Sequence, residues 1–183
     1  MESFEGHLLV ASPQLLDPNF AKSLVLLVEH NEEGTFGVVV NRPVRKTIQD
    51  LWREVGSAPC NSRQPVYLGG PVPGPLLSLH NKPSLAEMEP VPGVYFSARK
   101  QNLDQLVLDE EPAYKIFIGN SGWGAGQLEN ELRQGAWRTM PATAEMIFST
   151  ADDLWETVFR QLGRSLLKSM LKIKDLPPDP TVN

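Results

Sequence analysis

The 183-residue sequence has a single cysteine, Cys60, so no disulfide can form within the chain. A lone cysteine is typical of proteins from reducing compartments. The sequence has no apolar run near the ~20 residues that cross a bilayer, and its first residues are too polar for a signal-peptide core. We therefore expect a cytoplasmic protein that makes no contact with a membrane.

Positive charge is also scarce, because the chain has 17 Lys and Arg residues but 22 Asp and Glu residues, which gives it a net charge of −5. Non-specific nucleic-acid binding draws its affinity from cations that neutralise phosphates, so the bulk charge disfavours it. One basic series, with members four residues apart, would form a stripe on a continuous helix. The members of this stripe are Arg160, Arg164, Lys168 and Lys172. Such a stripe is usually a solvated helix face, but binding of nucleic acid through it remains an alternative.

The sequence lacks the usual signatures of catalysis and cofactor binding. Its three histidines do not form HExxH, and CxxC, GxSxG, GxGxxG and P-loop patterns are all missing. We expect no metal and no cofactor, and the sequence identifies no catalytic residue. A non-enzymatic binding protein is therefore favoured, while an acid–base site made from a histidine and a carboxylate remains the alternative.

Sixteen prolines and 14 glycines lie in short clusters between apolar runs, which indicates many short elements joined by tight turns. Ser23–Glu29 and Phe36–Val40 are rich in Val and Leu, and Asn31–Gly34 between them predicts a hairpin loop. Further strands are predicted at residues 8–10, 66–68, 76–80, 94–96, 114–118 and 137–140.

Helical periodicity appears at 48–55, with Thr47 and Asp50 in a capping pattern and Gly56 as a stop. Other helices are predicted from Ser97 to Leu108, at 127–134, and at 151–162, the last closed by Gly163. Because regular βαβ alternation is absent, we predict a single α+β domain over 1–176. Its sheet should be mostly antiparallel or mixed, with helices packed beside it and a disordered tail at 177–183.

Polar residues at the ends of apolar strands, together with the glycine-rich segment 119–126, are candidates for a binding surface. We expect them to converge in one recessed patch, where Arg42 would hold an anion, the histidines would donate hydrogen bonds and Trp123 would stack on a ligand. The alternative is that the glycine-rich segment 119–126 is only a structural turn, since acidic residues in the first turn of the following helix can interact with the helix dipole in place of an anionic ligand. The candidates are His30, Asn41, Arg42, Gly70, His80, Trp123, Gln127 and Glu129.

Four segments carry a family resemblance: LLVASPQLLDPNFAKSLVLLVEHNEEGTFGVVVNRP, YLGGPV, LSLH and GNSGWGAGQLENEL. In this order and spacing they resemble the YqgE/AlgH family of bacterial proteins. The resemblance implies an α+β domain with coiled, bifurcated sheets in the cytosol. The chain departs from the family pattern at Gly74-Pro75-Leu76, where the family has an arginine, a glycine and an aromatic residue, so a site that needs this arginine is not carried over.

Some members of that family are labelled transcriptional regulators, although no DNA-binding motif accompanies the label here. The leading hypothesis is therefore a binding or regulatory protein whose partner is an unidentified protein or a small anionic ligand. A DNA-binding regulator that uses the C-terminal basic stripe is the other alternative.

Overall fold

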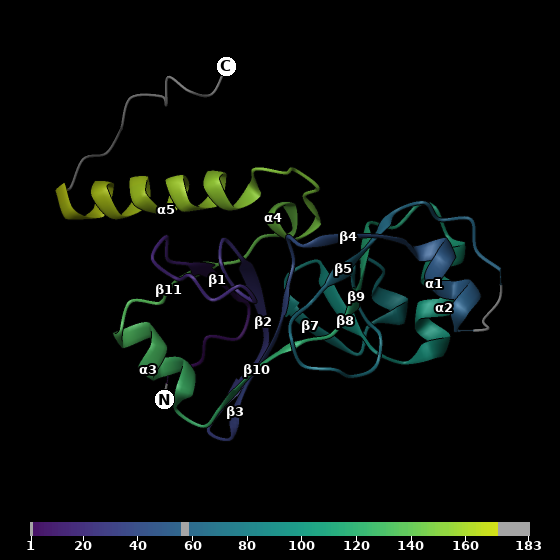
Figure 1. Cartoon of the computed structure of the whole chain (residues 1–183), viewed down its shortest axis with the longest axis horizontal. Helices are drawn as coiled ribbons and strands as arrows, with labels where there is room; N and C mark the ends of the chain where they lie inside the picture. Colours follow the sequence, from purple (N-terminus) through teal and green to yellow (C-terminus); the bar gives the residue numbers. More distant parts are fainter. Residues whose placement is uncertain (1, 56–58, 172–183) are drawn as a thin grey trace, which may run out of the picture.

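A computed structural model describes residues 2–55 and 59–171, and it contains two β-sheets flanked by helices (Figure 1). The first sheet has the strand order β10-β3-β2-β1-β11, and neighbouring strands in it are antiparallel. Its strands are β1 (His7–Ala11), β2 (Leu24–Asn31), β3 (Gly34–Val39), β10 (Ser121–Gly124) and β11 (Trp137–Pro141).

The second sheet has the order β4-β5-β9-β6-β8-β7 and is mixed, because β5 and β9 run parallel to each other. Its strands are β4 (Pro43–Thr47), β5 (Pro65–Leu68), β6 (Leu77–His80), β7 (Met88–Val91), β8 (Val94–Ser97) and β9 (Tyr114–Ile118). The helices are α1 (Ile48–Glu54), η1 (Pro83–Leu85), α2 (Lys100–Leu108), α3 (Gln127–Arg133), α4 (Ala144–Phe148) and α5 (Leu154–Leu171). The predicted α+β fold class is confirmed.

The predicted hairpin is confirmed as β2 and β3, which are joined by two residues. Asn31 pairs with Gly34, and the Asn31 side chain accepts a hydrogen bond from the Glu33 amide at 2.9 Å. At the far end of β3, the Val39 amide donates to the Gly69 carbonyl at 2.8 Å and so joins the hairpin to the second sheet.

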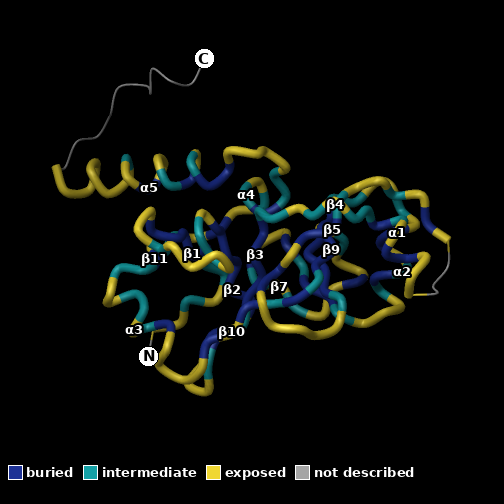
Figure 2. Tube along the Cα trace, in the orientation of Figure 1, coloured by how far each residue is buried: buried dark blue, intermediate teal, exposed yellow. Residues whose placement is uncertain are grey.

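Both faces of the first sheet are buried, which explains its continuous apolar runs. Since successive side chains of a strand point to opposite faces, Leu8 and Leu9 of β1 enter different cores. Leu8 joins a central cluster that reaches the second sheet, α4 and α5, whereas Leu9 joins the cluster beneath α3. Buried segments accordingly run through the middle of the molecule in Figure 2.

A third core lies where α1 and α2 pack on the second sheet around Trp52, Leu103 and Ile116. The capping pattern predicted for α1 is confirmed, because the Thr47 hydroxyl accepts from the Asp50 amide at 3.2 Å and the Asp50 carboxylate accepts from the Thr47 amide. The Trp52 indole donates to Asp104 at 2.9 Å and fixes α1 to α2.

Two predicted helix ends are wrong. Gly163 does not close the last helix, because α5 continues to Leu171. A glycine within a helix costs only about 1 kcal/mol relative to alanine, and good helix formers follow it here. Ser97 does not cap α2, because Ser97 is a buried residue of β8 and Arg99 is the N-cap. The predicted stop at Gly56 and the predicted tail at 177–183 lie outside the described residues.

Candidate functional site

Four of the predicted binding residues lie around α3, and His30 is at the centre of this group. Its Nδ1 accepts a hydrogen bond from the Phe4 amide at 2.9 Å, so the ring proton is on Nε2, which donates to Glu129 at 2.7 Å. The amide of Glu129 itself and then the His30 ring lower the pKa of the Glu129 carboxyl. Because both ring nitrogens are engaged and the side chain is 1% exposed, His30 ties the N-terminal segment to β2 and α3.

Trp123 and Gln127 belong to the same group, but they face the protein interior or a neighbouring side chain. The Trp123 residue is 5% exposed, and its indole donates to Glu131 at 2.9 Å. Glu131 also accepts from Trp137 at 2.9 Å and from Gln127 at 3.0 Å. The indole of Trp123 therefore packs in the core beneath α3, away from a position where it could stack on a ligand.

Asn41 and Arg42 lie in a second place, at the end of the β2–β3 hairpin. Asn41 accepts from the Leu24 amide and donates to the Lys22 carbonyl, both at 2.9 Å. Arg42 donates to the carbonyls of Asn19 and Ala21. These side chains hold the loop before β2, so the guanidinium predicted to hold an anion is used to satisfy backbone groups.

Gly70 and His80 lie with the second sheet. Gly70 has a φ of +152° and packs against the backbone of Asn120. His80 is fully buried: its Nδ1 accepts from the Lys82 amide at 3.2 Å and its Nε2 donates to the Ser97 hydroxyl at 2.9 Å. The eight predicted residues therefore lie in four places instead of one recessed patch, since Gly70 contacts Asn120 after β9 whereas His80 pairs with Tyr114 at the start of β9. Most of the eight satisfy polar groups of nearby segments.

The buried His80 predicts a loss of stability in mild acid. Burial lowers its pKa from 6.5 to about 4, with Glu87 acting in the opposite direction. Between pH 6.5 and 4 the unfolded chain binds more protons, so the free energy of unfolding falls as the pH falls, by about 3 kcal/mol at most. In His80→Gln we expect lower stability at pH 7 but a flatter pH dependence in urea unfolding. Parallel curves for the two proteins would show that His80 is not the source.

The most unusual titratable group was not among the predicted residues. Lys115 of β9 is 3% exposed, and its ammonium group donates to the carbonyls of Val40 at 2.8 Å and Ser149 at 2.7 Å. The same nitrogen lies 4.4 Å from the centroid of the Tyr67 ring. Within residues 2–55 and 59–171, no carboxylate forms an ion pair with it. Burial lowers the pKa of the Lys115 amine to about 7.

Lys115 lines a cavity of about 250 Å³, here called the Lys115 cavity. It lies beside the first residues of β5 and β9, and the end of α4 and the segment after it also contribute to its lining. Its walls combine three aromatic rings with amide and hydroxyl groups. They are formed by Gln64, Pro65, Tyr67, Ala113, Tyr114, Lys115, Phe148 and Thr150.

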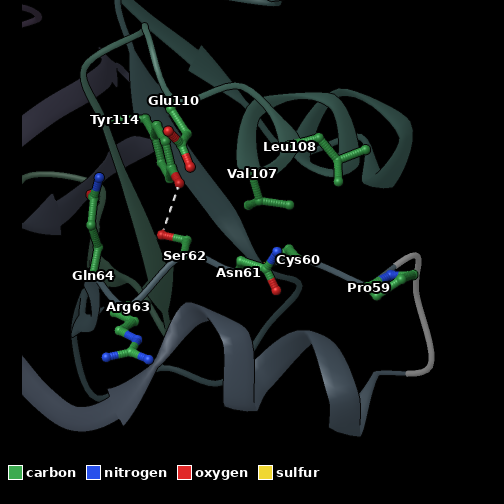
Figure 3. A pocket seen from close by; sticks show the side chains of 10 residues that line it. All are labelled: Pro59, Cys60, Asn61, Ser62, Arg63, Gln64, Val107, Leu108, Glu110 and Tyr114. Atoms are coloured by element: carbon green, nitrogen blue, oxygen red, sulfur yellow. Dashed lines mark hydrogen bonds between the residues drawn. The ribbon is translucent and has the colours of Figure 1, made fainter.

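A second cavity of about 570 Å³ shares Gln64 and Tyr114 with the first and lies between the 59–64 loop and the end of α2 (Figure 3). The Tyr114 hydroxyl donates to Ser62 at 3.1 Å, and Arg63 points away from this pair (Figure 3). Tyr114 lines both cavities, whereas its neighbour Lys115, whose side chain points to the other face of β9, lines only the smaller one. The Lys115 cavity is the one that contains a buried charge.

Comparison with known proteins gives consistent results for sequence and structure. The AlgH-like family model matches residues 8–167. A UPF0301 protein from Myxococcus xanthus is 38% identical over 168 residues, which cover 89% of this chain and 93% of that protein. One from Vibrio parahaemolyticus is 35% identical and covers 86% and 91%. The solution structure of the AlgH protein from Pseudomonas aeruginosa has a TM-score of 0.71 at 29% identity, over 97% of this chain and 100% of that one.

Proposed function

The chain belongs to the AlgH-like family, and from this starting point we propose that it is a non-enzymatic, cytoplasmic binding protein for a small carboxylate. The ligand would occupy the Lys115 cavity. The observation that carries the proposal is a buried ammonium group that borders a cavity and has no ion-pair partner among the described residues. The single cysteine, Cys60, supports the cytoplasmic setting.

Electrostatics favour an anion at this position. A buried charge is costly unless it is paired, and a cation of this kind is normally matched by a carboxylate. The partners of Lys115 are two neutral carbonyls and an aromatic ring, which satisfy its N–H groups but leave its charge uncompensated. A carboxylate in the cavity would supply the missing counter-charge and stabilise the protonated amine.

The cavity also limits the size of the ligand. A volume of about 250 Å³ corresponds to roughly eight water molecules at ~30 Å³ each, which suits a short-chain acid. Tyr67 and Phe148 can contact the hydrocarbon part, while Gln64 and Thr150 can form hydrogen bonds at the opening. Small-molecule sites commonly combine apolar walls with a few polar groups in this way.

Binding is better supported than acid–base catalysis at a histidine. Such catalysis needs a ring nitrogen within hydrogen-bond reach of the substrate. Both nitrogens of His30 and both nitrogens of His80 are engaged with protein groups. The His30–Glu129 pair consists of the residue types of an acid–base site, but its hydrogen bonds hold the N-terminal segment, β2 and α3 together.

The proposal is tested by NMR titration of the protein with butyrate and with its neutral amide, butyramide, at pH 6. We expect saturable shifts at Tyr67, Phe148 and Thr150 with butyrate, at millimolar concentration or below, and none with butyramide. A ligand of this size can reach such affinity within the ceiling of about 1.5 kcal/mol per non-hydrogen atom. Affinity should fall as the pH rises above 7, because Lys115 then loses its proton.

Lys115→Met removes the cation and should abolish the saturable shifts. Lys100→Met is the matched control, because Lys100 is an exposed lysine on α2 that pairs with Asp104. It should bind butyrate as the wild type does. Equal responses to butyrate and butyramide, or butyrate binding that survives in Lys115→Met, would contradict the proposal.

A further inference from the structure

Lys115 has a second property, which the binding of a carboxylate does not use: its hydrogen bonds match those of a neutral amine. The nitrogen donates to two carbonyls, that of Val40 at 2.8 Å and that of Ser149 at 2.7 Å. A neutral primary amine has two N–H groups and one lone pair, whereas an ammonium group has three N–H groups. Two acceptors therefore satisfy the neutral amine fully, so the fold can hold Lys115 with a free lone pair on its nitrogen.

The charge state of Lys115 also differs from that of other lysines. Four other lysines among the described residues each pair with a carboxylate: Lys22, Lys46, Lys82 and Lys100. An opposite charge at this distance favours the charged form of an amine, which is not a nucleophile. Burial instead lowers the pKa of the Lys115 amine to about 7, so at pH 7.5 about three quarters of it is neutral. For a lysine with the ordinary pKa of 10.5 the neutral fraction is about one in a thousand.

The cavity beside this amine suits a small carbonyl compound. Its volume is about 250 Å³, and its walls include the rings of Tyr67, Tyr114 and Phe148. A desolvated lysine in an apolar setting is the kind of lysine that forms Schiff bases with carbonyl substrates. Because Lys115 is 3% exposed, little bulk water reaches the nitrogen to hydrolyse a bond formed there.

We propose that Lys115 binds a small aldehyde covalently and reversibly, as an imine in the Lys115 cavity. The lone pair of Nζ attacks the carbonyl carbon to give a carbinolamine, which loses one water molecule and leaves a C=N bond between Nζ and that carbon. Protonation by solvent then gives an iminium with one N–H. This N–H can stay on the buried Val40 carbonyl, while the Ser149 carbonyl, whose bond to Lys115 is only partly buried, can turn to water. This activity shares the cavity with the proposed carboxylate site but uses the neutral amine instead of the cation.

The other groups of the cavity determine the class of ligand and the pH range. Among the described residues that line it there is no carboxylate, histidine or arginine, and Lys115 is the one lysine. With no second cation in the walls, an uncharged aliphatic aldehyde suits the neutral amine better than an acid does. The remaining titratable groups are the hydroxyls of Tyr67 and Tyr114, and burial raises the pKa of both. Both tyrosines therefore stay neutral between pH 6 and 8, so reactivity in this range follows the amine.

Reductive trapping on the full chain tests this proposal. Butyraldehyde and sodium cyanoborohydride are added together, and the reductant converts each imine into a stable butyl amine that peptide mass spectrometry locates. At pH 7.5 we expect Lys115 to be labelled at least about tenfold faster than Lys82, because far more of its amine is neutral. Lys82 is the matched internal control, since 35% of its side chain is exposed but it pairs with Asp109 at 3.0 Å. The labelling rate of Lys115 should rise from pH 6 and level off near pH 8.

A polymeric aldehyde, oxidised dextran, tests whether the cavity is the route to the amine. It is too large to enter, so it should label Lys82 and leave Lys115 unmodified. Labelling of Lys115 by the polymer would mean that the amine reacts in an unfolded chain, and labelling of Lys82 as fast as Lys115 would remove the special reactivity. Either result would overturn the proposal. Butyrate binding at pH 6 without trapping at Lys115 would leave the carboxylate site and remove the imine, whereas trapping without butyrate binding would do the reverse.

Discussion

Gly70→Ala should destabilise the protein by at least about 4 kcal/mol, enough to remove much of the stability of a typical domain. An ideal Cβ at this position would overlap the carbonyl oxygen of Asn120 and the hydroxyl of Ser121. Neither group can move freely, because Asn120 exchanges two backbone hydrogen bonds with Val72 and the Ser121 hydroxyl donates to Gly69. The φ of +152° adds a conformational cost for any residue with a side chain.

Gly93→Ala separates the two effects. Gly93 has a φ of +78°, but a Cβ there would meet nothing within 4 Å, so only the backbone conformation is penalised. We expect this control to cost about 1–2 kcal/mol in urea unfolding followed by tryptophan fluorescence. If Gly70→Ala loses no more stability than Gly93→Ala, the close approach of β10 to the 69–72 turn is not a constraint on the fold.

Much of the fold could be predicted because local sequence and final packing agree. The β2–β3 hairpin has apolar strands around a short polar loop, and α1 has both partners of its capping box. Strand β10 was predicted as part of a glycine-rich turn, because Ser121–Gly124 contains two glycines and a strand there depends on pairing with β3. Register with a distant strand is not encoded in the four residues themselves.

The candidate site was harder to predict than the fold. Polar residues at strand ends, such as Asn41 and His80, suggested a surface, but each satisfies backbone or hydroxyl groups of a neighbouring segment. The sequence did contain one signal for the Lys115 cavity, namely a lysine inside the apolar run YKIFI of a central strand. Its significance depends on the carbonyls of Val40 and Ser149, which only the folded chain brings to β9.

Lys115 should give the protein a stability that rises with pH in the alkaline range. Its pKa is about 7 in the folded chain, while an exposed lysine has a pKa near 10.5. Between these values the unfolded chain binds more protons, so the free energy of unfolding increases with pH, by about 3 kcal/mol between pH 7 and 9.5. Below pH 7 both states are protonated, and the contribution of Lys115 no longer changes.

The upper limit of this window is set by two tyrosines. Burial raises the pKa of Tyr67 and of Tyr114, so both oppose the lysine effect once the pH exceeds 10. Urea unfolding at pH 7, 8, 9 and 9.5 should therefore show the rise in the wild type and in Lys100→Met, but not in Lys115→Met. A wild-type curve that stays parallel to that of Lys115→Met would mean that the amine keeps its proton in the fold. The carbonyls of Val40 and Ser149 would then not be enough to explain how the buried positive charge of Lys115 is stabilised.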